Sequence, residues 1–204
     1  RPKASIIDKD GSLAIAKFPK PDDDINISAW EAVALTMARK AKIPTPDFRI
    51  ENIDGKSVLV LQRFDLQNGK RIPFLSAMSM LGSEDNQTRS YIEIADAIRQ
   101  YGAKADDDCA QLWRRIVFNI MIANTDDHLR NHGFLYEKNG WRLSPAYDLN
   151  PVPIDIKPRV LSTAINEVET EGNLEIALEV SRHFGLKIDE AKLIISEVSN
   201  VVSN

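Results

Sequence analysis

Hydrophobic and polar residues alternate through the first 62 positions in the manner of short strands separated by turns. Asp-Gly dipeptides, which favour tight hairpin turns, separate these strands in pairs. The predicted strands are residues 4–7 and 13–18 around Asp10-Gly11, and residues 48–50 and 57–62 around Asp54-Gly55. Between the two pairs, Ser28 and Glu31 have the spacing of a capping box, so we expect a helix over residues 29–41.

After about residue 70 the apolar spacing changes to that of helices. A second capping box, Ser90-x-x-Glu93, opens a helix that ends before Gly102. The acidic triplet 106–108 begins a helix that runs to about residue 123, and its apolar positions 112, 116, 117 and 120 predict burial. Two more helices are expected over 173–184 and 189–202. The predicted fold class is therefore α+β, with a small β-rich lobe (residues 1–66) and a larger helical lobe (residues 67–204).

A β-hairpin interrupts the helical part at residues 133–144. The strands 133–138 and 141–144 surround Asn139-Gly140, a strong two-residue hairpin signal. We expect a register that places Glu137 opposite Arg142, a favourable pair of charges. The same register, continued outward, brings Asn131 opposite Asp148, although the proline at 145 weakens the ladder before that point.

The composition is that of an ordinary globular protein, since 43% of the 204 residues are hydrophobic, 27% are charged and the net charge is −4. This composition excludes a disordered chain, a collagen-like chain and a coiled coil. No apolar run reaches the roughly 18 residues of a membrane span, and no polybasic cluster indicates a grip on nucleic acid. A single cysteine, Cys109, and the lack of a signal peptide favour a cytoplasmic location.

The most informative polar stretch is residues 124–131, which follows a predicted buried helix. Asp126 and Asn131 lie five residues apart on this loop, and the hairpin brings Asp148 towards them. Oxygen ligands of this kind suit Mg²⁺, and a further carboxylate can receive the proton of a hydroxyl during phosphoryl transfer. Each residue also has an ordinary interpretation: Asp126 as the end of a helix, Asn131 as a turn residue and Asp148 as the start of the next turn.

The spacing Asp126-x4-Asn131, followed by Gly140-Trp-Arg-Leu-Ser-Pro-Ala-Tyr-Asp148-Leu, resembles the HipA family of serine/threonine kinases. These are the toxin halves of bacterial toxin–antitoxin pairs, and the likeness extends over nearly the whole chain. The resemblance implies a protein-kinase-like two-lobed fold. It also implies that Asp126 is the catalytic base and that Asn131 and Asp148 bind Mg²⁺. His128 and His132 lie four residues apart like a zinc pair, but the His-Glu-x-x-His pattern is missing. We therefore expect His128 to brace the catalytic loop and count it among the cofactor-binding residues.

The resemblance also implies an ATP grip in the first lobe. Lys17, at a strand end, corresponds to a residue that contacts the ATP phosphates, although it could be a plain exposed lysine. Glu31 corresponds to the glutamate that pairs with this lysine, and the capping box remains an equal alternative. Backbone groups of Gln62 and Phe64, in Leu-Gln-Arg-Phe-Asp, are expected to bind adenine, while core packing is the simpler role for Phe64.

The function implied is an ATP- and Mg²⁺-dependent protein kinase that phosphorylates a cellular protein and arrests growth. The implied partner is a helix-turn-helix antitoxin, through which contact with DNA is indirect. The family places a glycine-rich segment just before Arg1, so the loop that covers the phosphates cannot be assigned in this sequence. Two alternatives remain: a small-molecule phosphotransferase similar to aminoglycoside kinases, and a non-catalytic kinase-like binding module.

Overall fold

The first part of the chain forms a four-stranded antiparallel sheet. A computed structural model describes residues 2–23, 25–67, 69–85, 87–152 and 160–203. The strands β1 (Lys3–Ile7), β2 (Leu13–Lys17), β3 (Phe48–Ile53) and β4 (Lys56–Gln62) are arranged in the order β1-β2-β4-β3. Both predicted Asp-Gly turns are confirmed, and Gly11 and Gly55 have the positive φ angles of 82° and 76° that such turns require.

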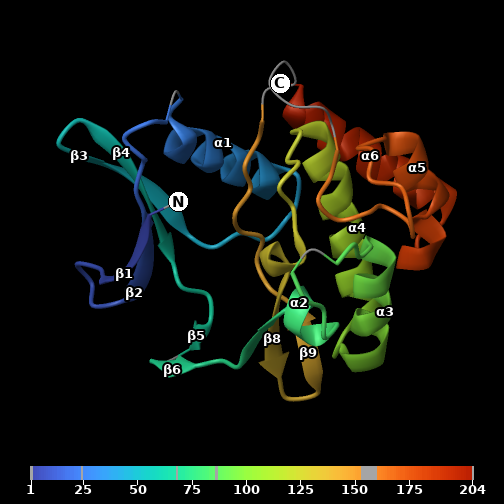
Figure 1. Cartoon of the computed structure of the whole chain (residues 1–204). Helices are drawn as coiled ribbons and strands as arrows, with labels where there is room; N and C mark the ends of the chain where they lie inside the picture. The colour runs from blue at the N-terminus through green and yellow to red at the C-terminus, as the bar shows by residue number, and fades with distance from the viewer. Residues whose placement is uncertain (1, 24, 68, 86, 153–159, 204) are drawn as a thin grey trace.

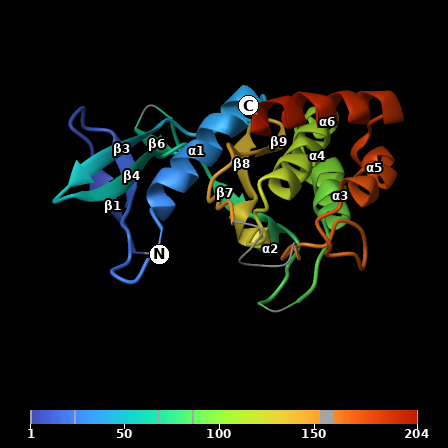
Figure 2. The same cartoon turned by 90° about the horizontal axis from the view of Figure 1, so that it is seen from above.

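One helix, α1 (Ile27–Lys40), lies between this sheet and the helical part of the chain (Figures 1 and 2). Asn26 caps it, because the Asn26 side chain accepts a hydrogen bond of 3.1 Å from the amide of Ala29. The predicted capping box of Ser28 and Glu31 is therefore wrong. The helix begins before Ser28, which is buried within its first turn, and the carboxylate of Glu31 has a different partner.

Short strands connect the sheet to the helices. The strands β5 (Leu66–Gln67) and β6 (Lys70–Arg71) form a small ribbon, and β7 (Phe74–Ser76) leads into the one-turn helix α2 (Ala77–Met80). A second sheet has the order β7-β8-β9, with β8 (Gly133–Glu137) and β9 (Gly140–Leu143). The strand β7 is not apparent from the sequence, because three residues are too few to show an alternating pattern.

The helical part contains α3 (Tyr91–Tyr101), α4 (Ala105–Met121), α5 (Leu174–Glu179) and α6 (Ile188–Val202), with short 3-10 turns η1 (Leu129–Asn131) and η2 (Ser181–Phe184). The capping box of Ser90 and Glu93 is confirmed. The helix expected over 173–184 is divided, since α5 ends before Val180 and the chain continues as η2. Figure 1 shows α3 and α4 packed together, with α5 and α6 on their outer side. Among the described residues, every helix is too short or too polar to cross a bilayer.

Helix α4 lies at the centre of the main core. Leu112, Trp113 and Ile116 on this helix have no exposed surface, and the indole of Trp113 donates to the carbonyl of Ala177 on α5 at 3.0 Å. The same core continues into the sheet through Leu59 and Leu61 of β4. The alternate residues of β4, Val58 and Val60, face a second, smaller hydrophobic cluster on the other side of the sheet. One strand therefore joins the sheet to the helical core.

The register of the β8–β9 hairpin is shifted by two positions from the prediction, and residues 138–139 form the turn instead of Asn139-Gly140. Tyr136 pairs with Trp141, and Glu137 pairs with Gly140 instead of Arg142. Two contacts explain this register. The rings of Tyr136 and Trp141 pack edge to face with centroids 5.2 Å apart, and Arg142 turns to the carboxylate of Asp108 on α4, with hydrogen bonds of 2.8 and 3.1 Å. The ladder consequently does not place Asn131 opposite Asp148.

The last helix is tied to the end of α1. Glu197 on α6 forms ion pairs with Lys42, two residues beyond α1, at 2.6 Å and with Arg114 on α4 at 2.7 Å. Arg114 also donates to the carbonyl of Ala41 at 3.2 Å. In both views the C-terminal helix passes close to the end of α1 (Figures 1 and 2). These contacts fix α1, and with it Glu31, relative to the helical core.

Candidate active site

The ammonium of Lys17 brings together three distant segments of the chain. Lys17 ends β2 and is 8% exposed. Its Nζ forms ion pairs with the carboxylates of Glu31 on α1 and Asp148 in the segment after β9. Of the two roles left open for Glu31, the structure therefore shows the ion pair with lysine. Lys17 is also not the exposed strand lysine of the simpler interpretation.

Asp148 is held in the ionised form and in an uncommon backbone conformation. Its burial raises the pKa of its carboxyl, but the charge and hydrogen bond of Lys17 outweigh this effect, so the pKa lies below its ordinary value. The nearby charges of Lys3 and His128 act in the same direction. The φ angle of Asp148 is 54°, in the left-handed region that aspartate tolerates better than most residues. The backbone thus turns sharply at the residue that meets Lys17.

The polar loop after α4 exposes Asp126 and buries its neighbours. Helix α4 ends at Met121, so Asp126 lies beyond the helix end and does not terminate it. The carbonyl of Asp126 accepts hydrogen bonds from the amide of His128 at 3.0 Å and from the side chain of Asn131 at 2.9 Å. The peptide group of Asp126 is therefore fixed from inside the loop, while its carboxylate faces solvent.

His128 braces this loop through its backbone, as its amide donates to Asp126 and its carbonyl accepts from the amide of Asn131 at 2.8 Å. Its half-buried imidazole lies close enough to Asp148 to lower the pKa of that carboxyl. Asn131 itself is buried and belongs to the 3-10 turn η1. Asn131 and Asp148 make their contacts with different partners, Asp126 and Lys17 respectively.

Asp127 is the residue of this loop that sequence reasoning missed. Its Oδ2 atom accepts three hydrogen bonds from buried side chains, whose donors are Tyr91 at 2.6 Å, Asn119 at 2.7 Å and His132 at 2.9 Å. Its carbonyl accepts a fourth, at 2.7 Å, from the hydroxyl of Thr163. The only signal in the sequence was an acidic residue beside Asp126, because the donors lie up to 36 residues away along the chain.

The carboxylate of Asp127 remains ionised although it is 2% exposed. Burial raises the pKa of Asp127, but the charge and hydrogen bond of His132, the hydrogen bond from Tyr91 and the charge of Arg115 together place it below the ordinary value. Arg115 is buried as well, which lowers the pKa of its guanidinium to about 10. The loop is therefore anchored by the buried carboxylate of Asp127, which has the buried guanidinium of Arg115 near it.

The expected adenine-binding segment lies where the two sheets meet. The amide of Gln62 donates to the carbonyl of Asp47 at 2.7 Å. The expected backbone contact of Gln62 with adenine would therefore be made by its carbonyl oxygen. The ring of Phe64 packs against Tyr147 and Phe74, with centroid distances of 5.6 and 6.2 Å. Packing of Phe64, the simpler of its two roles, is thus observed, and it places Phe64 beside the neighbour of Asp148.

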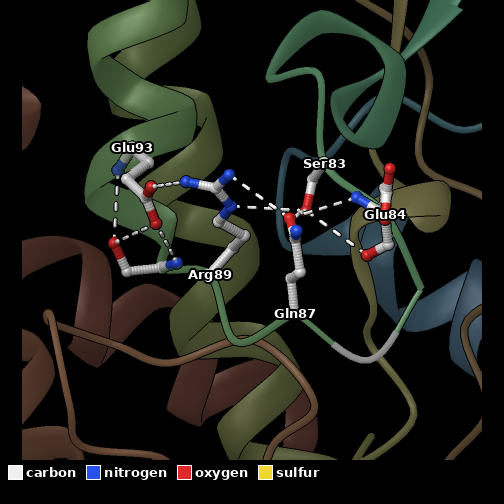
Figure 3. Close-up of polar contacts among 6 residues, drawn as sticks. Ser83, Glu84, Gln87, Arg89 and Glu93 are labelled. Atoms are coloured by element: carbon white, nitrogen blue, oxygen red, sulfur yellow. Dashed lines mark hydrogen bonds and ion pairs between the residues drawn. The ribbon is translucent and has the colours of Figure 1, made fainter.

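The segment before α3 contacts the loop of residues 124–131. Figure 3 shows Arg89 between Glu93 on one side and Ser83 and Gln87 on the other, with hydrogen bonds of 2.8, 3.3 and 3.4 Å. These contacts hold the segment in a closed turn. Asp85 in the same segment forms an ion pair with Arg130, which joins this segment to the loop of residues 124–131.

No group of three or more histidine, cysteine, aspartate or glutamate side chains among the described residues is arranged to hold a metal ion. A magnesium site here would consequently depend on Asn131 and Asp148, together with ligands from the nucleotide and water.

Curated relatives of the chain are named as kinases. It is 31% identical over 109 residues to a putative kinase of Haemophilus influenzae, an alignment that covers 52% of this chain and 32% of that protein. It is 23% identical over 148 residues to the putative kinase Y4mE of Sinorhizobium fredii, covering 66% of this chain and 33% of that protein. The chain therefore spans about a third of the length of these relatives.

Solved structures show the same fold. The HipA toxin of Shewanella oneidensis MR-1, determined in complex with HipB and operator DNA, superposes with a TM-score of 0.82 at 16% identity over 98% of this chain and 55% of that chain. The proinflammatory kinase CtkA of Helicobacter pylori gives 0.65 at 13% identity, over 98% of this chain and 90% of that chain. The predicted kinase-like fold is thereby confirmed. A family model described as the HipA-like C-terminal domain matches residues 1–204, and the chain belongs to this family.

Proposed function

We propose that this chain is the catalytic region of an ATP- and Mg²⁺-dependent protein serine/threonine kinase of HipA type, with residues 1–66 as its N-lobe and 67–204 as its C-lobe. The observation that carries the proposal is the buried ammonium of Lys17, shared by the carboxylates of Glu31 and Asp148. A lysine on a strand, a glutamate on the adjacent helix and an aspartate after a hairpin are the parts that position a nucleotide in protein kinases.

In this proposal Lys17 binds phosphate oxygens of ATP. Glu31, which is 1% exposed, orients Lys17 because one of its carboxylate oxygens accepts a hydrogen bond from the ammonium. The carbonyl of Gln62 and the amide of Phe64 contact the adenine ring. The sheet thus supplies the grip on the nucleotide, and the helical part supplies the reacting groups.

Asp126 serves as the base on the acceptor side. Its exposed carboxylate can accept a hydrogen bond from an incoming hydroxyl and take its proton as the phosphoryl group is transferred. The two hydrogen bonds to the Asp126 carbonyl, from His128 and Asn131, hold the backbone still while this occurs. Fixed geometry of this kind is the main contribution of the protein in phosphoryl transfer.

The residues present fit a magnesium ion. Asp148 supplies an ionised carboxylate, since its pKa is lowered, and Asn131 supplies a carboxamide oxygen whose amide nitrogen is already committed to the Asp126 carbonyl. Both are hard oxygen ligands, which Mg²⁺ prefers. When bound there, Mg²⁺ would neutralise charge on the phosphates. Asp148 and Asn131 would hold it, and Lys17 would complete the positive surroundings.

Transfer of labelled phosphate from ATP to protein substrates, measured on the full-length protein, tests the proposal. We expect Asp126→Asn to lose activity by at least about 100-fold with an unchanged melting temperature, because it removes the base from an exposed position. Asp107→Asn, an equally exposed carboxylate at the start of α4, is the matched control and should retain activity. Normal transfer by Asp126→Asn would refute the assignment. Transfer to small molecules alone would favour the alternative phosphotransferase.

Calorimetry with a non-hydrolysable ATP analogue separates binding from catalysis. The wild-type protein should bind the analogue more tightly with Mg²⁺ than without it, and Asp148→Asn should abolish this difference. Glu84→Gln, in the segment of Figure 3, is a suitable control because Glu84 uses its backbone in the contacts drawn. Absence of any binding to the full-length wild type would support a non-catalytic module.

We also propose a helix-turn-helix antitoxin of HipB type as the partner in the cytoplasm. The structural neighbour from Shewanella oneidensis was determined with HipB and operator DNA, and the net charge of −4 on this chain fits a contact with DNA through such a partner. Co-purification of the full-length protein with the product of a neighbouring reading frame tests this. Binding of operator DNA by the kinase alone would contradict it.

A further inference from the structure

We infer that Asp127 is a positioning residue that holds Asp126 in place for phosphoryl transfer, through hydrogen bonds with Tyr91, Asn119 and His132. The inference rests on the proposed function, because it gives Asp127 a task in the same loop. Asp127 is adjacent to the proposed base, yet its side chain points the opposite way, into the core.

The hydrogen bonds of Asp127 fix the loop to four separate parts of the fold. Tyr91 begins α3, Asn119 lies in the last turn of α4, and His132 precedes β8. Thr163, in the segment before α5, donates to the Asp127 carbonyl. One hydrogen bond would leave Asp127 free to rotate. Four hydrogen bonds from different directions fix its orientation, and with it the peptide group that links Asp127 to Asp126.

The charge of Asp127 explains why these contacts are firm. A buried carboxylate is costly unless it is hydrogen-bonded and balanced by positive charge. Here three donors converge on one oxygen, and Arg115, which is also buried, contributes a favourable charge interaction. Loss of one donor leaves part of this cost uncompensated, so the loop should shift or open before the helices around it do.

The ion pairs of Lys17 with Glu31 and Asp148 involve none of these residues, whereas Asn131, of the proposed magnesium site, lies in the same loop as Asp127. Asp127 is hydrogen-bonded to residues of the helical part and of the segment before β8. A displaced loop should therefore reduce kcat by a larger factor than it raises the KM for ATP. A general loss of folding would lower both the active fraction and the thermal stability instead.

Steady-state kinetics of the full-length protein tests this separation. We expect Tyr91→Phe to lower kcat about 10-fold and Asp127→Asn about 100-fold, with a smaller change in the KM for ATP, in keeping with the sensitivity of catalysis to small displacements. Tyr101→Phe, at an exposed tyrosine of the same helix, should leave kcat unchanged. Val198→Ala in α6 is the control for general destabilisation, since Val198 is fully buried away from the loop.

Hydrogen exchange of the loop amides provides a readout without activity. The amides of His128 and Asn131 are bonded within the loop, and their exchange should accelerate in Tyr91→Phe but not in Tyr101→Phe. Unchanged exchange together with unchanged kcat would overturn the inference, as would an equal loss of kcat in Val198→Ala. If the wild type transfers no phosphate, the proposed function fails, and the exchange data still decide whether Asp127 anchors the loop.

Discussion

Lys17 and Asp148 form an ion pair across 131 residues of the chain. The pair joins the end of β2 to the segment after the second sheet, and Glu31 completes it from α1. Three elements that are distant in the sequence are therefore held by one ammonium. Because that ammonium is almost entirely buried, its removal should lower the free energy of unfolding and also weaken nucleotide binding.

Lys17→Met should lower the free energy of unfolding by about 2–4 kcal/mol, because it leaves Glu31 charged and buried without its cation. The double variant Lys17→Met/Glu31→Gln should recover part of this loss, since the second change removes the buried charge. Urea denaturation measures both. A double variant less stable than the sum of the single changes would contradict the assigned pair.

Asp148 offers a test of its backbone conformation. At a φ angle of 54°, Asp148→Asn should be about 1 kcal/mol more stable than Asp148→Ala, because asparagine adopts left-handed conformations more readily than alanine. Both variants should lose the dependence of nucleotide binding on Mg²⁺. Thermal denaturation compares their stabilities, and equal melting temperatures would argue against a strained turn at this position.

The acidic triplet at the start of α4 separates two effects on stability. Asp108→Ala should cost about 2–4 kcal/mol, because Asp108 is buried, receives two hydrogen bonds from Arg142 and one from the amide of Leu143. Asp107→Ala, at an exposed position, should cost less than about 1 kcal/mol, the usual effect of a helix dipole. Similar losses in chemical denaturation of the two variants would show that the hairpin does not depend on Asp108.

The raised pKa of the Cys109 thiol predicts a loss of stability at alkaline pH. Burial raises the pKa of its thiol from 9.0 to about 11. Above pH 9 the unfolded chain releases this proton while the folded chain retains it, so the free energy of unfolding falls between pH 9 and 11, by at most about 1.4 kcal/mol per pH unit. Cys109→Ala should show a shallower decline over this range. Identical pH profiles for the two proteins would contradict the shift, as would rapid alkylation of the native thiol.

Local patterns predicted the elements better than the contacts between them. The turns at Gly11 and Gly55 and the cap at Ser90 are specified by a few adjacent residues, and the structure confirms all three. The first helix is capped by Asn26 instead of Ser28, because two capping residues two positions apart leave the helix start ambiguous from sequence alone.

The hairpin shows why register was harder to predict. Charge pairing favoured Glu137 opposite Arg142, and the two side chains do form an ion pair at 3.9 Å, but outside the predicted register. Arg142 makes its shorter contacts with Asp108, a residue 34 positions earlier in the chain. A sequence pattern contains no information on that distant carboxylate. The same reason hid the role of Asp127, whose donors come from α3, α4 and the start of β8. Family spacing could indicate Asp126, Asn131 and Asp148, but not the buried residues that support them.

The ion pairs of Glu197 with Lys42 and Arg114 have a practical consequence for future protein design. They couple α6 to α1, the helix that carries Glu31, so a change on the face of α6 that carries Glu197 would act on a structural support of the ion pair between Lys17 and Glu31. We therefore expect substitutions on this face of α6, although distant from the loop of Asp126, to influence the measured turnover.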